Sequence, residues 1–175
     1  MPRARHLPLQ DVPVRGVFPG SFDPPTVAHL AIADAAVRHC ALDHLDLVVS
    51  RVPLGKDHAA QTPVEERVST LRRLATGRPW LEVAVTDARL LADVAAGYDV
   101  LVVGADKWAQ LHDPTWYGGS AQARDDALAR LPRVVVAPRA GFALPEAVEV
   151  LAVHPEHHGV SSTAVRAGRE DWRAG

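Results

Sequence analysis

The sequence is poor in cysteine and has no long apolar run. Its 175 residues include one cysteine, Cys40, which excludes an intrachain disulfide and a zinc site built on several cysteines and is typical of a reducing cytoplasm. No apolar stretch approaches the ~20 residues of a membrane helix, and the N-terminus lacks the apolar segment of a signal peptide. The formal net charge of −2 creates no positive field toward nucleic acid or membrane. We therefore expect no nucleic acid and no membrane as partners, with a homo-oligomer left open.

Several common motifs are also missing. No GxGxxG follows a predicted strand, and the phosphate-binding pattern GxxxxGK[ST] is absent. The GxSxG turn of α/β-hydrolases is absent as well, which argues against that class of enzyme. Lysine is nearly absent too, since Lys56 and Lys107 are the only two in the chain.

What the sequence does contain is a regular alternation of short apolar runs and helical periodicity. Continuously apolar runs predict strands over residues 14–18, 45–50, 80–86, 98–104, 133–137 and 148–153. Helical spacing and capping residues predict helices over 27–40, 63–75, 88–96, 107–111 and 121–131, and a short last helix capped by Ser162 or Thr163. This order predicts a Rossmann-like α/β fold, a doubly wound parallel sheet forming a single domain over residues 14–175, after a loose leader over residues 1–13. Ligands of such sheets bind at the carboxyl ends of the strands.

The loop after the first predicted strand reads GSFDPPTVAH (20–29). Gly20 allows the backbone to turn and to approach a ligand. Thr26 and His29 lie three residues apart at the start of a helix, so they share a face where a phosphate can bind. From these residues alone, a proline-rich turn with a capping threonine and a surface histidine is an equally good interpretation.

A second run, GVSSTAVR (159–166), lies near the C-terminus. Three hydroxyl residues, Ser161, Ser162 and Thr163, stand at a helix start, and Arg166 follows one turn later. This is a pattern for a second anion site. An ordinary capped helix is the alternative.

Together the two runs resemble the nucleotidylyltransferase superfamily, whose marks are GxFDPx[HT]xGH after the first strand and ISSTxxR near the end. The resemblance covers roughly residues 14–168. It implies a doubly wound sheet and the transfer of a nucleotidyl group from a nucleoside triphosphate to a substrate phosphate, with release of pyrophosphate. It also implies small-molecule substrates as partners, with ATP among them, accompanied by Mg²⁺ with few protein ligands.

The resemblance assigns roles to individual residues. His29 would donate to the α-phosphate, and Thr26 would contact the same or the attacking phosphate. Asp106 would reach the nucleotide ribose or cap the helix after Gly104. The other implied nucleotide-binding residues are Gly20, Ser21, Phe22, Ser161, Ser162, Thr163 and Arg166.

Other segments favour particular acceptors. Gly104-Ala105-Asp106, Thr115-Trp116-Tyr117 and VVVAPRAG (134–141) resemble nicotinate or nicotinamide mononucleotide adenylyltransferases, which act in NAD biosynthesis. Thr26 with FPGSFDP, and VEERV (64–68), resemble phosphopantetheine adenylyltransferase instead. We expect an adenylyltransferase acting on a pyridine mononucleotide. One alternative is phosphopantetheine as acceptor. Another is a nucleotide-binding protein without catalysis, suggested by Thr26, by Ala28 in place of the usual glycine, and by the few residues after Arg166.

Two further residues are candidates for binding the second substrate. In relatives, a lysine in the loop that contains Lys56 approaches the acceptor's phosphate, although a solvated loop lysine is the alternative. Trp116 could stack on a ring or fill a hydrophobic lid. His154, His157 and His158 have no cysteine or carboxylate pattern beyond Glu156 to complete a metal site, so no metal site is expected and a polar loop near the phosphates is favoured.

Overall fold

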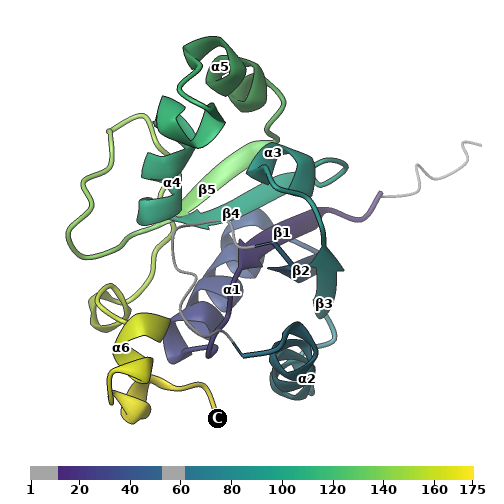
Figure 1. Cartoon of the computed structure of the whole chain (residues 1–175). Helices are drawn as coiled ribbons and strands as arrows, with labels where there is room; N and C mark the ends of the chain where they lie inside the picture. Colours follow the sequence, from purple (N-terminus) through teal and green to yellow (C-terminus); the bar gives the residue numbers. More distant parts are fainter. Residues whose placement is uncertain (1–11, 53–61) are drawn as a thin grey trace, which may run out of the picture.

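A five-stranded parallel sheet forms the centre of the chain, whose computed structural model describes residues 12–52 and 62–175 (Figure 1). Its strands are β1 (Arg15–Gly20), β2 (His44–Ser50), β3 (Leu81–Thr86), β4 (Val100–Gly104) and β5 (Arg133–Ala137), in the order β3-β2-β1-β4-β5. All four neighbouring pairs are parallel. The predicted doubly wound α/β fold is confirmed.

Six helices and three short 3₁₀ turns accompany the sheet in the described residues. The helices are α1 (Val27–Cys40), α2 (Val64–Ala75), α3 (Leu91–Val94), α4 (Ala105–His112), α5 (Ala121–Ala129) and α6 (Ser162–Arg166). The 3₁₀ turns are η1 (Pro114–Tyr117), η2 (Pro155–His157) and η3 (Glu170–Trp172). Among residues 12–52 and 62–175, no helix is both long enough and apolar enough to cross a bilayer.

The two faces of the sheet bury separate apolar clusters, which explains why its strands are continuously apolar. On one face Phe18 and Leu47 pack with Ala33 of α1 and Leu71 of α2. On the other face the buried cluster of strand residues, with Leu101 among them, includes residues of α3 and α4. Figure 1 shows α1 and α3 on opposite sides of the sheet.

The predicted strand over residues 148–153 is wrong. This segment meets β5 only at an isolated parallel bridge between Val136 and Val150. The next bond of such a ladder would need a backbone N–H from Pro138, which proline lacks. Two helix predictions also change in length: the helix predicted over 88–96 is the single turn α3, and the turn predicted over 107–111 is part of the longer α4. Most of the predicted leader, residues 1–11, lies outside the described residues.

Candidate active site

The site lies where the sheet order reverses, between β1 and β4. From β1 the chain builds outward through β2 and β3, then returns to place β4 on the other side of β1. The pairing of β1 with β4 covers only Gly16 with Val100 and Val17 with Leu101, although the strands end at Gly20 and Gly104. A cavity of about 210 Å³ lies at these strand ends, which is where doubly wound folds bind ligands.

Four stretches of chain line this cavity: the end of β1 with the start of α1, the start of α4, the residues after β5, and the segment around α6. The predicted residues among the lining are Gly20, Ser21, Phe22, Thr26, His29, Gly104, Asp106, Ser161, Ser162, Thr163 and Arg166. Trp116 is half-buried on η1 and is not part of the lining. Lys56 falls outside the described residues. The structure thus brings the two sequence motifs to one cavity and leaves Trp116 outside its lining.

Thr26 and His29 form a reciprocal cap at the start of α1. Thr26 is the N-cap residue, and its hydroxyl accepts the His29 backbone N–H at 3.4 Å. The Nδ1 atom of His29 accepts the Thr26 backbone N–H at 2.9 Å and lies 3.0 Å from the Thr26 hydroxyl. Because Nδ1 accepts a backbone proton, the proton of the neutral ring belongs on Nε2. Thr26 therefore caps α1, and the same cap fixes the tautomer of His29.

Aromatic packing holds the His29 ring in place. Phe22 is almost fully buried, and its ring meets the His29 ring edge-on with centroids 4.9 Å apart. The pKa of His29 is lowered to about 4, mainly by burial and also by the charge of Arg139, while the charge of Asp106 acts in the opposite direction. Around neutral pH, His29 is therefore an uncharged hydrogen-bond donor.

This environment makes a testable prediction about pH. We expect the His29 ring to titrate near pH 4 when its ring signals are followed by NMR, with His29→Gln used to assign them. Between pH 6.5 and 4 the unfolded chain binds a proton at this ring that the folded chain does not, so the free energy of unfolding should fall as the pH drops through this window. That loss should be smaller in His29→Gln. Titration of the folded ring near pH 6.5 would contradict the proposed environment.

Gly20 and Gly104 leave room for side chains that line the cavity. A Cβ atom at Gly20 would lie 2.8 Å from Cζ of Phe22, and one at Gly104 would lie 2.6 Å from Oδ1 of Asp106. Both distances are shorter than real Cβ contacts, so either substitution would displace its neighbour. The two glycines therefore allow the observed positions of Phe22 and Asp106.

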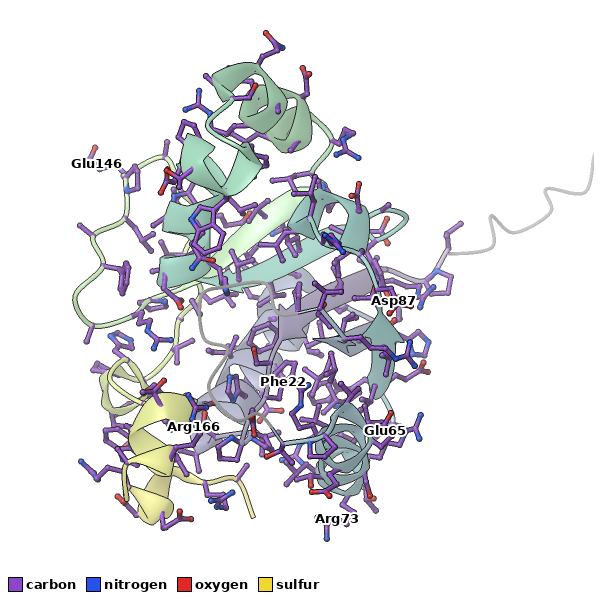
Figure 2. All side chains as sticks on the ribbon, viewed as in Figure 1. Phe22, Glu65, Arg73, Asp87, Glu146 and Arg166 are labelled. Carbon is purple, nitrogen blue, oxygen red and sulfur yellow. The ribbon has the colours of Figure 1, made fainter. Side chains whose placement is uncertain are left out.

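The C-terminal motif docks directly on the loop that precedes α1. The Ser162 hydroxyl donates to the Pro24 carbonyl at 2.7 Å, and the Arg166 guanidinium donates to the Asp23 carbonyl and, at 3.2 Å, to the Thr163 hydroxyl. Figure 1 shows α6 beside the first turn of α1, and Figure 2 labels Arg166 on α6. Ser161 caps α6 by accepting the Ala164 N–H at 3.1 Å. These contacts hold the two motifs together around one cavity.

Two buried charged residues near the site, Asp23 and Arg67, were not predicted from the sequence. The Asp23 carboxylate accepts the Thr62 N–H at 3.0 Å. Arg67 of α2 is only 5% exposed and donates to the carbonyls of Ser21 at 2.7 Å and Thr62 at 2.9 Å. Its spacing from the apolar residues Val64, Val68 and Leu71 is the signal that could have placed it on the buried face of α2.

Removing the Arg67 side chain should destabilise the fold. Arg67→Ala leaves two carbonyls without their charged donor, so we expect the free energy of unfolding to drop by about 2 kcal/mol, measured by urea denaturation. The matched control is Arg73→Ala on the same helix. The Arg73 side chain donates to Thr70 within α2 and points away from the rest of the chain in Figure 2. Equal stability of the two variants would show that the hydrogen bonds from Arg67 to Ser21 and Thr62 do not stabilise the fold.

The histidines of the predicted polar loop separate in the structure. His157 and His158 line the cavity, whereas His154 does not and its side chain is 70% exposed. The His158 Nε2 atom lies 2.9 Å from the Val153 carbonyl oxygen. Across residues 12–52 and 62–175, no group of three His, Cys, Asp or Glu side chains is arranged to hold a metal ion.

Comparison with known proteins now identifies the family. The model of the family described as cytidylyltransferase-like matches residues 17–168. The chain belongs to this family. Its members are nucleotidylyltransferases, so the resemblance inferred from the two motifs is confirmed.

Individual relatives agree with this assignment. A probable nicotinate-nucleotide adenylyltransferase of Geobacillus kaustophilus is 27% identical over 86% of this chain and 72% of its own length. One of Methylorubrum extorquens, described in the same words, is 31% identical over 74% of this chain and 71% of its own length. The solved structure of the Plasmodium falciparum nicotinic acid mononucleotide adenylyltransferase, complexed with NaAD, aligns with a TM-score of 0.63 at 14% identity, covering 89% of this chain and 83% of that one. This last similarity supports the same fold.

Proposed function

We propose that this nucleotidylyltransferase transfers the adenylyl group of ATP to the phosphate of nicotinate mononucleotide or nicotinamide mononucleotide. The observation that carries the chemistry is the cavity at the β1–β4 switch point, where a neutral, rigidly held His29 lies in the same lining as the hydroxyls and Arg166 of the C-terminal motif. The similarity to two bacterial proteins described as probable nicotinate-nucleotide adenylyltransferases supports the choice of acceptor.

In the proposed reaction, a phosphate oxygen of the mononucleotide attacks the α-phosphorus of ATP. The bond between the α-phosphorus and the oxygen that bridges to the β-phosphate breaks, and pyrophosphate leaves. His29 keeps its proton and donates Nε2–H to a non-bridging oxygen of the α-phosphate as charge develops there. No covalent nucleophile is required, because positioning and charge stabilisation supply the catalysis.

The remaining lining residues divide the nucleotide between them in this proposal. Thr26 lies beside the reacting phosphates, and Gly20, Ser21 and Phe22 offer backbone N–H groups. Asp106 accepts from the ribose hydroxyls. Ser161, Ser162, Thr163 and Arg166 hold the β- and γ-phosphates, for which a guanidinium and several hydroxyls on one short segment are suited.

Mg²⁺ is expected to enter with the nucleotide. The carboxylates in the described lining are already assigned, since Asp23 accepts the Thr62 N–H and Asp106 is proposed to accept from the ribose. The donor set therefore fits an ion held mainly by phosphate oxygens and water. When bound, the ion would neutralise charge on the phosphates. Lys56 and Trp116 stay predictions for the acceptor site.

A panel of acceptors tests the proposal. The protein is incubated with ATP, Mg²⁺ and one of nicotinate mononucleotide, nicotinamide mononucleotide, phosphopantetheine or no acceptor, and pyrophosphate is measured while the nucleotide product is identified by chromatography. We expect pyrophosphate and a dinucleotide with a pyridine mononucleotide. Turnover with phosphopantetheine alone would move the chain to the other acceptor, and no turnover with any acceptor would support binding without catalysis.

A further inference from the structure

Arg139 and Asp106 both line the cavity and form an ion pair there. Arg139 comes two residues after the end of β5. Nη1 of Arg139 and Oδ2 of Asp106 are 3.5 Å apart, and the two side chains are 37% and 29% exposed. The two backbones are fixed independently, because the Ala140 N–H donates to the His158 carbonyl at 2.9 Å while Asp106 belongs to the first turn of α4.

The contact between the two side chains is loose. A charge-assisted hydrogen bond of this kind usually measures 2.7–2.9 Å, and partly exposed ion pairs contribute little to stability. The Arg166 guanidinium, by contrast, donates to a backbone carbonyl and a hydroxyl of the chain itself. Arg139 is thus a cation of the lining that can exchange its partner at little cost.

A nucleotide carries groups that complement both members of the pair. Its phosphate oxygens accept hydrogen bonds from a guanidinium, which binds phosphate strongly and in two-pronged geometry. Its ribose hydroxyls donate to a carboxylate. Arg139 is also close enough to His29 to lower the pKa of that ring by its charge, which places it near the side chain proposed to contact the α-phosphate.

We propose that nucleotide binding breaks the Asp106–Arg139 ion pair, so that Arg139 binds a phosphate of the nucleotide and Asp106 turns to the ribose. The inference rests on the proposed function for the identity of the nucleotide. It adds a phosphate-binding residue outside both sequence motifs and makes Asp106 a competitor of phosphate in the empty cavity.

The test uses inorganic tripolyphosphate, which carries the phosphates without a ribose, and compares it with ATP by isothermal titration calorimetry. Arg139→Gln should weaken tripolyphosphate binding about tenfold, and Arg139→Lys should weaken it less. Asp106→Asn should strengthen tripolyphosphate binding several-fold, because it removes the competing carboxylate. The same variant should lower the ratio of ATP affinity to tripolyphosphate affinity, because it removes the acceptor for the ribose hydroxyls. The control is Arg133→Gln at the other end of β5, where Arg133 binds Glu149; it should leave both ligands unchanged.

The double variant separates partner exchange from a general effect of charge. If Arg139 binds phosphate, the gain from Asp106→Asn should disappear when Arg139→Gln is also present. A gain of the same size in both backgrounds, or unchanged binding in Arg139→Gln, would overturn the inference. Circular dichroism spectra confirm that each variant folds. If the unchanged protein turns over a pyridine mononucleotide but Arg139→Gln binds tripolyphosphate with unchanged affinity, this inference alone is refuted. If the variants show the expected binding pattern but the unchanged protein shows no turnover, the proposed function alone is refuted.

Discussion

Replacing His29 with alanine should lower kcat by at least about a hundredfold, corresponding to roughly 3 kcal/mol of lost transition-state stabilisation, as is typical for one preorganised donor. The reason is that the cap with Thr26 and the contact with Phe22 fix the ring before substrate arrives, so its Nε2–H needs no reorganisation during the reaction. ATP binding should weaken less, because the α6 residues remain. Initial rates at saturating substrates measure the effect.

His29→Ala also removes the acceptor for the Thr26 N–H, so a second variant is needed to separate catalysis from folding. Glutamine at this helix position can accept the same N–H in an ordinary capping box, but it lacks the imidazole. His29→Gln should therefore keep most of the stability and still lose turnover. His154→Ala, at an exposed histidine outside the lining, is the matched control. Unchanged turnover in His29→Gln would remove the central element of the proposed mechanism.

Arg166→Ala should weaken ATP about ten- to a hundredfold while leaving AMP nearly unchanged. A charge-assisted contact is worth about 1.5–3 kcal/mol, and AMP lacks the phosphates that Arg166 is proposed to hold. Arg166→Lys should restore only part of the affinity, since an ammonium group lacks the two-pronged geometry. Calorimetric titration of both nucleotides gives the comparison.

The structure adds a second role for Arg166 that this experiment must separate. Its guanidinium already joins the Asp23 carbonyl to the Thr163 hydroxyl, so its loss could loosen the loop itself. In that case ATP and AMP should weaken equally, and the polyphosphate site would lie elsewhere in the cavity. Arg169→Ala is the control, because that side chain pairs with Asp171 and packs on Trp172.

Much of the fold follows from local patterns in the sequence. The five strands found in the structure were all predicted, because a strand covered on both faces must be apolar along its whole length. The exception is instructive: residues 148–153 have the composition of a strand, but Pro138 on the neighbouring segment stops the ladder after one bridge. A strand needs a partner with free N–H groups, and its own sequence does not reveal whether the partner has them.

In the candidate site too, the sequence predicts the local contacts, whereas the contacts between distant segments depend on the fold. The cap between Thr26 and His29 spans three residues, so the sequence determined it by helix geometry alone, and the two motifs pointed to the nucleotidylyltransferase family before any fold was known. The docking of Ser162 on Pro24 joins residues 138 positions apart, and the burial of Arg67 and the pairing of Arg139 with Asp106 likewise depend on segments distant in the chain. Only the tertiary structure decided these contacts, because burial and electrostatic pairing depend on which surfaces the packed sheet brings together, and the periodicity of a single segment carries no information about its partner.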